Sequence, residues 1–386
     1  MFKPAEIDFS ILKQRAYNLR WASVPDGVIP LTAADPDFKC PLVVRQAIEQ
    51  YVDGGYFSYA PAEGLPEFKE ASAFYFNSKR NYNLKASDIL PVDSAAFGIY
   101  LICKSFLKQG DEAIIFDPVD FLFQYSIESV GATSLRFPIP QQAEKVDFSE
   151  LEKLITPKTK LICLCNPLNP TGKVFKKEEL EDLGNLAIKH NLIILSDEIW
   201  SDIVFSPHVF TSIGSISSDI SEHVVTVSGF SKSYGLAGLR IGMIATTNTK
   251  LFDCIFSSSL HQSTIHGANS LGQIAATAAL NHAGQWLSEF VVHLQKMRDL
   301  LTDGINEIKG LTTIAPEGCY VSLINIQATG LTSEEFHKKM LEKAKVAVVP
   351  GLTKWFGPSA EGFVRLSFAT SDVVLKDAIF RIKNNL

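Results

Sequence analysis

Between residues 90 and 245, short apolar segments rich in β-branched residues alternate with longer segments of helical periodicity. Two of the longer segments, residues 97–108 and 177–190, place apolar side chains at the spacing of one helix face. The apolar segments are residues 112–116, 160–165, 192–196, 223–227 and 241–246. This alternation predicts a mainly parallel sheet covered by helices, an α/β fold.

The pattern changes after residue 270. Residues 270–309 predict one long, mostly unbroken helix. Shorter strand-like and helical segments follow in mixed order, at residues 321–326, 333–343, 346–350 and 363–369. We therefore expect a second, α+β unit, because 386 residues also exceed the usual size of a single core.

The composition narrows the class of protein. Hydrophobic residues make up 46% and charged residues 20%, which excludes a mostly disordered chain. The net charge of −6 argues against nucleic-acid binding. With no secretion signal and no apolar run of roughly 18 residues, we expect a cytoplasmic protein with no membrane partner. The six cysteines lack metal-binding spacing, which predicts reduced thiols and no metal site.

Residues 229–242, GFSKSYGLAGLRIG, place Lys232 eight positions before Arg240 among several glycines. A lysine can lose its proton and act as a nucleophile, whereas an arginine keeps its charge and suits a phosphate group. The segment resembles the pyridoxal-phosphate attachment site of class I/II aminotransferases of fold type I. The resemblance implies that Lys232 holds the cofactor as a Schiff base and that Arg240 binds its phosphate. Two solvated cations in a glycine-rich surface loop are the alternative.

Two further motifs follow predicted strands. Asn169 lies in NPLNPTG after residues 160–165, and Asp197 lies in SDEIW at the end of residues 192–196. In an open parallel sheet, ligands bind at the carboxyl ends of the strands. The resemblance implies that Asn169 contacts the cofactor's phenolic oxygen and the substrate, and that Asp197 keeps the pyridine nitrogen protonated. A turn at Asn169, and a helix cap or metal ligand at Asp197, are the alternatives.

The resemblance extends to residues at both ends of the chain. Arg365, inside the apolar segment FVRLSFA, matches the arginine that binds the substrate's α-carboxylate. The backbone near Ala34, in AADPDF, is a second candidate contact to that carboxylate. Tyr59 matches a tyrosine that reaches the phosphate of the neighbouring subunit, which implies a homodimer with shared active sites; a half-buried core tyrosine is the alternative.

Several positions depart from the family pattern. Trp200 stands where a tyrosine usually donates to the phenolic oxygen, and an indole N–H can still donate. Gly229 replaces a phosphate-binding serine, so that Ser231 or Ser228 would have to compensate. The usual glycine-containing phosphate loop is replaced by DSAAFG, with Ser94 where glycine is common. The backbone amides that can still bind the phosphate at this helix start belong to Ser94, Ala95 and Ala96.

The remaining departure is Asp120, at the position of the aromatic residue that stacks on the pyridine ring. A carboxylate cannot stack in this way, so we hypothesise that Phe121 or Phe123 supplies the ring face. Asp120 would then point toward the substrate or a neighbouring cation. A capped turn with Asp120 in solvent is equally compatible with the sequence.

The resemblance predicts a large domain at residues 45–275 with a mainly parallel seven-stranded sheet. Residues 1–44 and 276–386 would form the smaller α+β domain. The predicted function is pyridoxal-phosphate-dependent transfer of an amino group between an L-amino acid and a 2-oxo acid. A carbon–sulfur β-lyase, as in the cystathionine β-lyase-like branch, is the nearest alternative. A non-catalytic regulator is less favoured, because about thirty residues before AADPDF leave no room for a DNA-binding domain.

Overall fold

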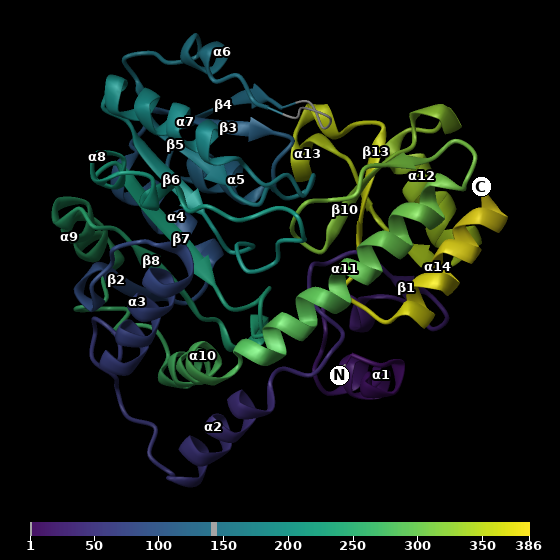
Figure 1. Cartoon of the computed structure of the whole chain (residues 1–386), viewed down its shortest axis with the longest axis horizontal. Helices are drawn as coiled ribbons and strands as arrows, with labels where there is room; N and C mark the ends of the chain where they lie inside the picture. The colour runs from purple at the N-terminus through teal and green to yellow at the C-terminus, as the bar shows by residue number, and fades with distance from the viewer. Residues whose placement is uncertain (1, 140–144) are drawn as a thin grey trace.

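The computed structural model describes residues 2–139 and 145–386, and a seven-stranded sheet lies at the centre of this part of the chain (Figure 1). Strand β8 is antiparallel to both of its neighbours, and the other paired strands are parallel, which confirms the predicted α/β fold. In spatial order the strands are β2 (Ile89–Val92), β8 (Gly242–Ala245), β7 (Val224–Gly229), β6 (Ile193–Asp197), β5 (Thr159–Cys165), β3 (Glu112–Asp117) and β4 (Thr133–Pro138).

The central strands are covered on both faces. Successive residues of a strand point to opposite faces of the sheet, and every residue of β5 from Leu161 to Cys165 is buried. Helix α4 (Ala95–Phe106) packs on β6, β7 and β8, and α7 (Lys177–His190) packs on β6. The other helices of this part of the chain are α2 (Leu42–Asp53), α3 (Pro66–Arg80), α5 (Leu122–Ser129), α6 (Ser149–Glu152), α8 (Ser218–Ser221) and α9 (Thr249–Ser259).

A second group of strands forms the C-terminal unit. Its four-stranded sheet has the order β12 (Val349–Pro350), β13 (Phe363–Ser367), β10 (Val321–Asn325) and β9 (Thr312–Thr313). Strand β1 (Ile29–Pro30) pairs in parallel with β11 (Val346–Ala347), so part of the N-terminal segment packs beside this unit. The predicted strand at residues 346–350 is therefore two short strands in different sheets. The exact domain boundaries at residues 44 and 275 stay a prediction.

The long helix predicted at residues 270–309 is divided. Helix α10 (Ser270–His282) ends before Ala283, whose backbone leaves the helical region at φ −100° and ψ 15°, and α11 (Gly284–Asn306) begins after it. The two helices have different neighbours, because α10 packs on α2 and α3 whereas α11 packs on α14 (Asp372–Asn385). Figure 1 shows α11 extending from the end of α10 to the C-terminal unit.

The C-terminal unit is completed by short elements. Helix α12 (Ser333–Lys339) continues into a π-helical turn over Met340–Ala344, and α13 (Thr353–Phe356) precedes β13. At the other end of the chain, α1 (Phe9–Gln14) packs against the short helical turn Trp21–Ser23. Within the described ranges, no helix combines the length and the apolar composition needed to span a membrane. None of the six cysteines forms a disulfide bond.

Candidate active site

The parallel strands bring the predicted site residues to one edge of the large sheet. Asp197 ends β6, Asn169 follows β5, and Lys232 follows β7. A cavity of about 290 Å³ lies at this edge, in the position where open parallel sheets bind ligands. Its lining includes Ala34, Ser94, Ala95, Ala96, Asn169, Asp197, Trp200, Ser231, Lys232, Arg240 and Arg365.

Lys232 lies in the middle of this arrangement. Its Nζ donates a 2.7 Å hydrogen bond to the carbonyl oxygen of Ala34 and lies 5.4 Å from the centre of the Trp200 ring. Burial of the amine lowers the pKa of Lys232, although the carboxylates of Asp35 and Asp120 oppose this shift. Its neutral, nucleophilic form is therefore more accessible than that of a solvated lysine.

One end of the cavity is suited to a phosphate group. Arg240 donates from Nη2 to the Ser94 hydroxyl oxygen at 2.8 Å, and Ser94 caps α4 by accepting a 3.1 Å hydrogen bond from the Phe97 amide. The start of α4 therefore presents free backbone amides beside a guanidinium group. Gly242 allows this approach, because a Cβ there would lie 2.5 Å from the Ala95 nitrogen.

Asp197 and Trp200 lie deeper in the cavity. The Oδ1 atom of Asp197 accepts a 3.1 Å hydrogen bond from the Ile199 amide, yet burial raises the pKa of this carboxyl to about 7. A cationic ring nitrogen beside it would favour the ionised carboxylate. Trp200 is only 2% exposed, and its ring meets Tyr320 edge to face at 4.7 Å.

Tyr320 is a site residue that the sequence did not reveal. Its hydroxyl donates a 3.1 Å hydrogen bond to the Ala34 carbonyl, which also accepts from Lys232. The two donors fix the N-terminal segment against the cavity. Tyr320 directly precedes β10 and belongs to no motif, so only its apolar setting could have indicated that it was buried.

Arg365, on strand β13, also lines the cavity. Its Nη1 donates to the side-chain oxygen of Asn169 at 3.1 Å, and its Nη2 donates to the Thr32 carbonyl at 3.0 Å. The guanidinium carbon lies 5.1 Å from the centre of the Phe356 ring. Its buried Nε has no partner among the described residues. A planar guanidinium held in this way can bind a carboxylate.

The comparisons with known proteins agree with this geometry. Residues 26–382 match the family model for aminotransferase class I and II. The chain belongs to this family. The aspartate aminotransferase of Pyrococcus abyssi is 32% identical over 363 residues, covering 93% of this chain and 92% of that relative. The cystathionine beta-lyase PatB of Bacillus subtilis is 31% identical over 359 residues, and the match covers 92% of this chain and 92% of that relative.

A solved structure shows the same fold over the whole length of this aminotransferase-family chain. The pyridoxal-phosphate-bound putative aminotransferase of Clostridium difficile superposes with a TM-score of 0.91 at 26% identity, covering 100% of both chains. The protein is thus a pyridoxal-phosphate-dependent enzyme of fold type I. Its residues fit the cofactor, because a lysine of lowered pKa lines the same cavity as the Arg240 guanidinium group and the buried Asp197 carboxyl.

Asp120 contacts two of the predicted site residues. Its Oδ2 accepts a 2.9 Å hydrogen bond from the side-chain nitrogen Nδ2 of Asn169 and lies 3.9 Å from Nη1 of Arg365. Its Oδ1 accepts a 3.3 Å hydrogen bond from the Leu122 amide, so Asp120 also caps a turn. The side chain is 20% exposed and lines the cavity, which excludes the interpretation that it lies in open solvent.

Two predicted cofactor contacts lie outside the cavity lining. Phe121 packs against Tyr125 and Trp355 instead, whereas Phe123 lines the cavity. Of the two phenylalanines considered for the ring face, the structure therefore favours Phe123. Tyr59 is 87% exposed, with its ring against His266 at 4.6 Å.

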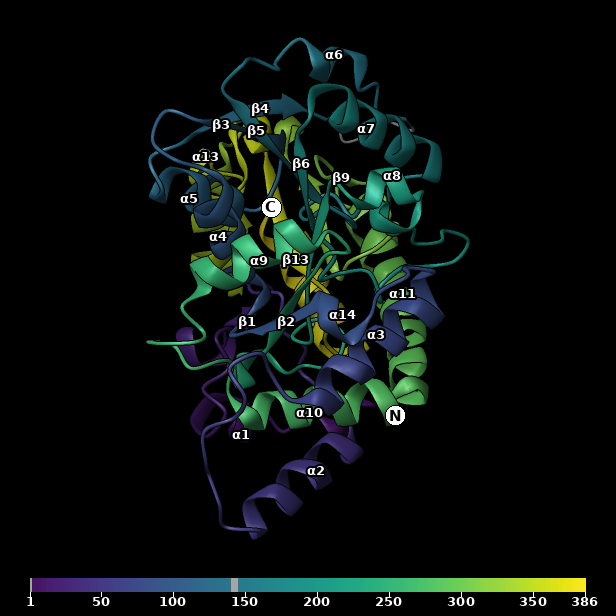
Figure 2. The ribbon, with the colours of Figure 1, turned by 90° about the vertical axis from the view of Figure 1, so that its left-hand side faces the viewer.

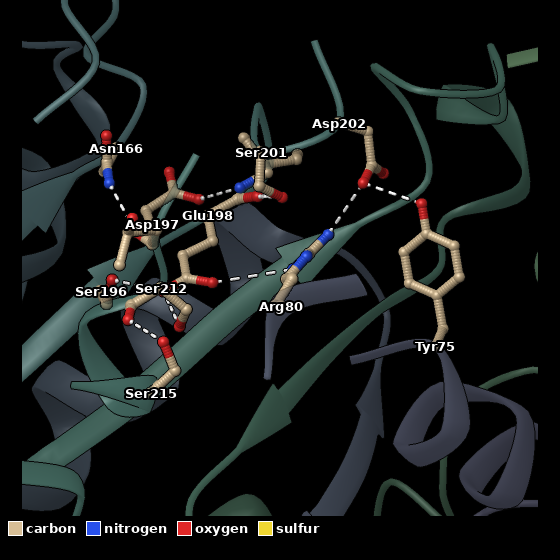
Figure 3. A network of polar contacts seen from close by, with 12 residues as sticks. Tyr75, Arg80, Asn166, Ser196, Asp197, Glu198, Ser201, Asp202, Ser212 and Ser215 are labelled. Atoms are coloured by element: carbon tan, nitrogen blue, oxygen red, sulfur yellow. Dashed lines mark hydrogen bonds and ion pairs between the residues drawn. The ribbon is translucent and has the colours of Figure 1, made fainter. Parts of the chain in front are cut away.

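A polar network that no motif indicated lies beside Asp197 (Figure 3). Glu198 is fully buried, and its Oε1 accepts hydrogen bonds from Ser196 at 3.1 Å and Ser212 at 2.7 Å. Its Oε2 lies 3.7 Å from Nη1 of Arg80, the last residue of α3. Burial raises the pKa of Glu198 to about 7, against the opposing effect of Arg80. Adjacent acids at the end of β6 are thus held in different surroundings.

The same network reaches the segment that carries Lys232. Arg80 donates to Oδ1 of Asp202 at 3.1 Å, and the Tyr75 hydroxyl donates to the same atom at 2.9 Å. The hydroxyl of Ser233 donates to Oδ2 of Asp202 at 2.8 Å. Helix α3, the segment after β6 and the segment after β7 are therefore linked through Asp202.

Proposed function

We propose that the protein transfers the amino group of an L-amino acid to a 2-oxo acid, with the reaction taking place at Lys232. The observation that supports this most is that one cavity contains Lys232 together with a candidate phosphate site and a candidate carboxylate site. Arg240 and the start of α4 form the first, and Arg365 forms the second. A small amino acid and the cofactor can both be held there.

Each residue then has a separate task. Pyridoxal phosphate, when bound, supplies an electron-accepting ring that stabilises negative charge on the substrate's α-carbon. Asp197 would hold the protonated pyridine nitrogen of the cofactor, and Asn169 with Trp200 would hold its phenolic oxygen. Lys232, once its Nζ is free, removes the α-proton as a general base. Arg365, with Asn169 and the backbone near Ala34, binds the substrate's carboxylate.

The test is an assay of the purified protein, with pyridoxal phosphate, against a panel of amino acids and 2-oxo acids. We expect at least one pair to yield the exchanged amino acid and oxo acid in equal amounts. Lys232→Ala should lose this activity by roughly 10⁴-fold or more, as for other residues that form the reacting centre. Exposed Lys250→Ala serves as the matched control. Absence of transfer from every pair, in a protein that binds the cofactor, would contradict the proposal.

A carbon–sulfur β-lyase is the second candidate. Trp200 in place of the usual tyrosine supports it, and so does the similarity to cystathionine beta-lyase PatB. Both reactions begin with removal of the α-proton, and they diverge only in what leaves the substrate afterwards. Incubation with cystathionine separates them, because a lyase releases pyruvate, ammonia and a thiol without any oxo acid. A lack of pyruvate from every β-substituted amino acid would exclude this candidate.

We also propose that the protein acts as a homodimer in which Tyr59 reaches the phosphate site of the neighbouring subunit. Tyr56, Phe57 and Tyr59 are 83%, 68% and 87% exposed, and large apolar side chains gathered on a surface are typical of interfaces. They follow α2, which projects from the body of the chain in Figures 1 and 2. Sedimentation at the mass of one 42.5 kDa chain would contradict this proposal.

A further inference from the structure

Asp120 lies among the groups that would receive the reacting end of an amino acid. Its carboxylate contacts Asn169 at 2.9 Å and lies 3.9 Å from Arg365, the residue proposed to bind the α-carboxylate. An amino acid carries its ammonium group on the carbon next to that carboxylate. Binding at Arg365 therefore brings the ammonium group close to Asp120.

The carboxylate of Asp120 can accept a further hydrogen bond. An ionised carboxylate has about four lone-pair positions, and Asp120 accepts hydrogen bonds only from the Leu122 amide and the Asn169 side chain within the described residues. The titratable groups that face it are Arg365 from β13, Lys232 after β7, Asp197 from β6 and Cys165 from β5. Arg365 and Lys232 are the cations among them.

Substrate binding changes the charge around Asp120. The α-carboxylate takes up the charge of Arg365, so Asp120 then lies beside a second anion in a poorly solvated site. Two neighbouring negative charges, here the substrate's carboxylate and Asp120, disfavour ionisation of one of them. Burial already raises the pKa of Asp120 above that of a solvated aspartate. Both effects make Asp120 a better proton acceptor when the substrate is in place.

We propose that Asp120 accepts a proton from the α-ammonium group of the incoming amino acid. The N–H bond breaks, its electron pair stays on the nitrogen as a lone pair, and an O–H bond forms on the Asp120 carboxyl. Only the neutral amine has a lone pair and can react as a nucleophile. This step rests on the proposed function, and it applies equally to amino transfer and β-elimination.

The first experiment compares the pH dependence of kcat/KM in the wild type and Asp120→Asn. Asparagine keeps the size of the side chain but cannot take the proton. We expect the variant to be slower by roughly 10²-fold or more at pH 7, the range typical of general acid–base catalysis. Its kcat/KM should rise tenfold per pH unit and approach the wild-type value once the substrate's own amine is deprotonated. If Asp120→Asn does not fold, Asp120→Ser replaces it.

A change of substrate sharpens this experiment. The trifluoro analogue of α-aminobutyrate has an amine of lower pKa, because fluorine withdraws electrons. The rising limb of the Asp120→Asn profile should move to lower pH with this analogue, whereas the wild-type profile should not follow the amine's pKa. Asp117→Asn is the matched control, since it makes the same change three residues earlier, outside the cavity lining. Its profile should have the wild-type shape.

A binding measurement gives a second readout without turnover. The α-methyl amino acid α-aminoisobutyrate has no α-proton to lose, so its binding can be followed by calorimetry in buffers of different ionisation enthalpy. At pH 7 the wild-type complex should retain the proton of the ammonium group on the Asp120 carboxyl. The complex of Asp120→Asn has no such acceptor and should release roughly one proton more to the buffer. Equal proton release from both proteins would overturn the proposal.

The outcomes separate this inference from the proposed function. A loss of kcat/KM in Asp120→Asn that is the same at every pH would show that Asp120 only positions Asn169 and Arg365, and would overturn the inference alone. A wild-type protein that turns over no amino acid would overturn the proposed function instead. An amine-dependent profile in Asp120→Asn, with turnover restored at high pH, supports both.

Discussion

Burial acts in opposite directions on Asp197 and Lys232. It raises the pKa of the carboxyl to about 7 and lowers the pKa of the amine, so both groups move toward their neutral forms in the cofactor-free protein. A pyridinium nitrogen would restore the charge on Asp197. A cationic ring in the cavity would therefore compensate for the burial of the acid at the end of β6.

The raised pKa of Asp197 predicts a pH-dependent cost to stability. Between about pH 4 and pH 7 the folded protein binds a proton that the unfolded chain has released, because the folded pKa of about 7 exceeds the usual 3.8. Stability therefore falls as pH rises through this window, and the full cost is present above pH 7. Asp197→Asn removes the cost but keeps an oxygen that accepts from the Ile199 amide.

We expect cofactor-free Asp197→Asn to be more stable than the wild type at pH 8, by a free energy of unfolding on the order of 1 to 4 kcal/mol. The gain should shrink at pH 5. Urea unfolding at the two pH values measures it. A variant that is equally stable or less stable at pH 8 would contradict the assigned direction. The same substitution should weaken cofactor binding, which shows that stability and function oppose each other at this residue.

At the residue scale, the sequence predicted the groups that belong to motifs. Lys232, Asn169, Asp197 and Arg365 lie in segments whose order and spacing are specific, and the structure brings them into one cavity. The sequence could not identify which residues contact Asp120, because Asn169 and Arg365 of strand β13 lie far from it along the chain. Tyr320 and Arg80 were not predicted for the same reason, since long-range packing alone gives them their contacts.

At the scale of elements, the proposed phosphate site depends on how closely β8 approaches the start of α4. A Cβ at Gly242 would lie 2.5 Å from the Ala95 nitrogen and 2.6 Å from the Ser94 carbonyl carbon, both of them backbone atoms. Backbone cannot yield as a flexible side chain can. The start of α4, whose amides we propose bind the phosphate, would have to move.

Gly242→Ala should therefore reduce stability by roughly 1 to 3 kcal/mol, as overpacking in a core does, and should weaken cofactor binding. Gly238→Ala is the matched control, because a Cβ at Gly238 meets nothing within 4 Å. Its stability should change by less than about 0.5 kcal/mol. Thermal melts and fluorescence titration with pyridoxal phosphate measure both quantities. Equal behaviour of the two variants would disprove the role given to this contact.

Elements were predictable where local pattern and tertiary environment agree. Strands β3, β5, β6, β7 and β8 are apolar because helices cover them, and each was predicted. Strand β2 contains Pro91, which is tolerated there because β2 is at the edge of the sheet. Strand β4, at the other edge, is largely half-exposed and lacks a continuous apolar run. The break at Ala283 arises from packing on different neighbours, which no local signal reveals.

At the scale of the whole molecule, the active site exists only because distant segments meet. Residues at or just after the carboxyl ends of β3, β5, β6 and β7 line the cavity together with Arg365 of β13 and with Ala33 and Ala34 of the N-terminal segment. The pairing of β1 with β11 and the hydrogen bonds to the Ala34 carbonyl hold the N-terminal segment in place. The relative position of the two sheets thus determines whether a substrate can be bound.

The central claim is that Lys232 is the residue that holds pyridoxal phosphate. Borohydride reduction of the cofactor-loaded protein fixes the cofactor to its lysine, and peptide mass spectrometry locates the modified residue. We predict one phosphopyridoxyl group per chain, on the peptide that contains Lys232, and no label on that peptide in folded Lys232→Ala. A label on another lysine, or an unlabelled Lys232 in protein that has bound the cofactor, would contradict the account.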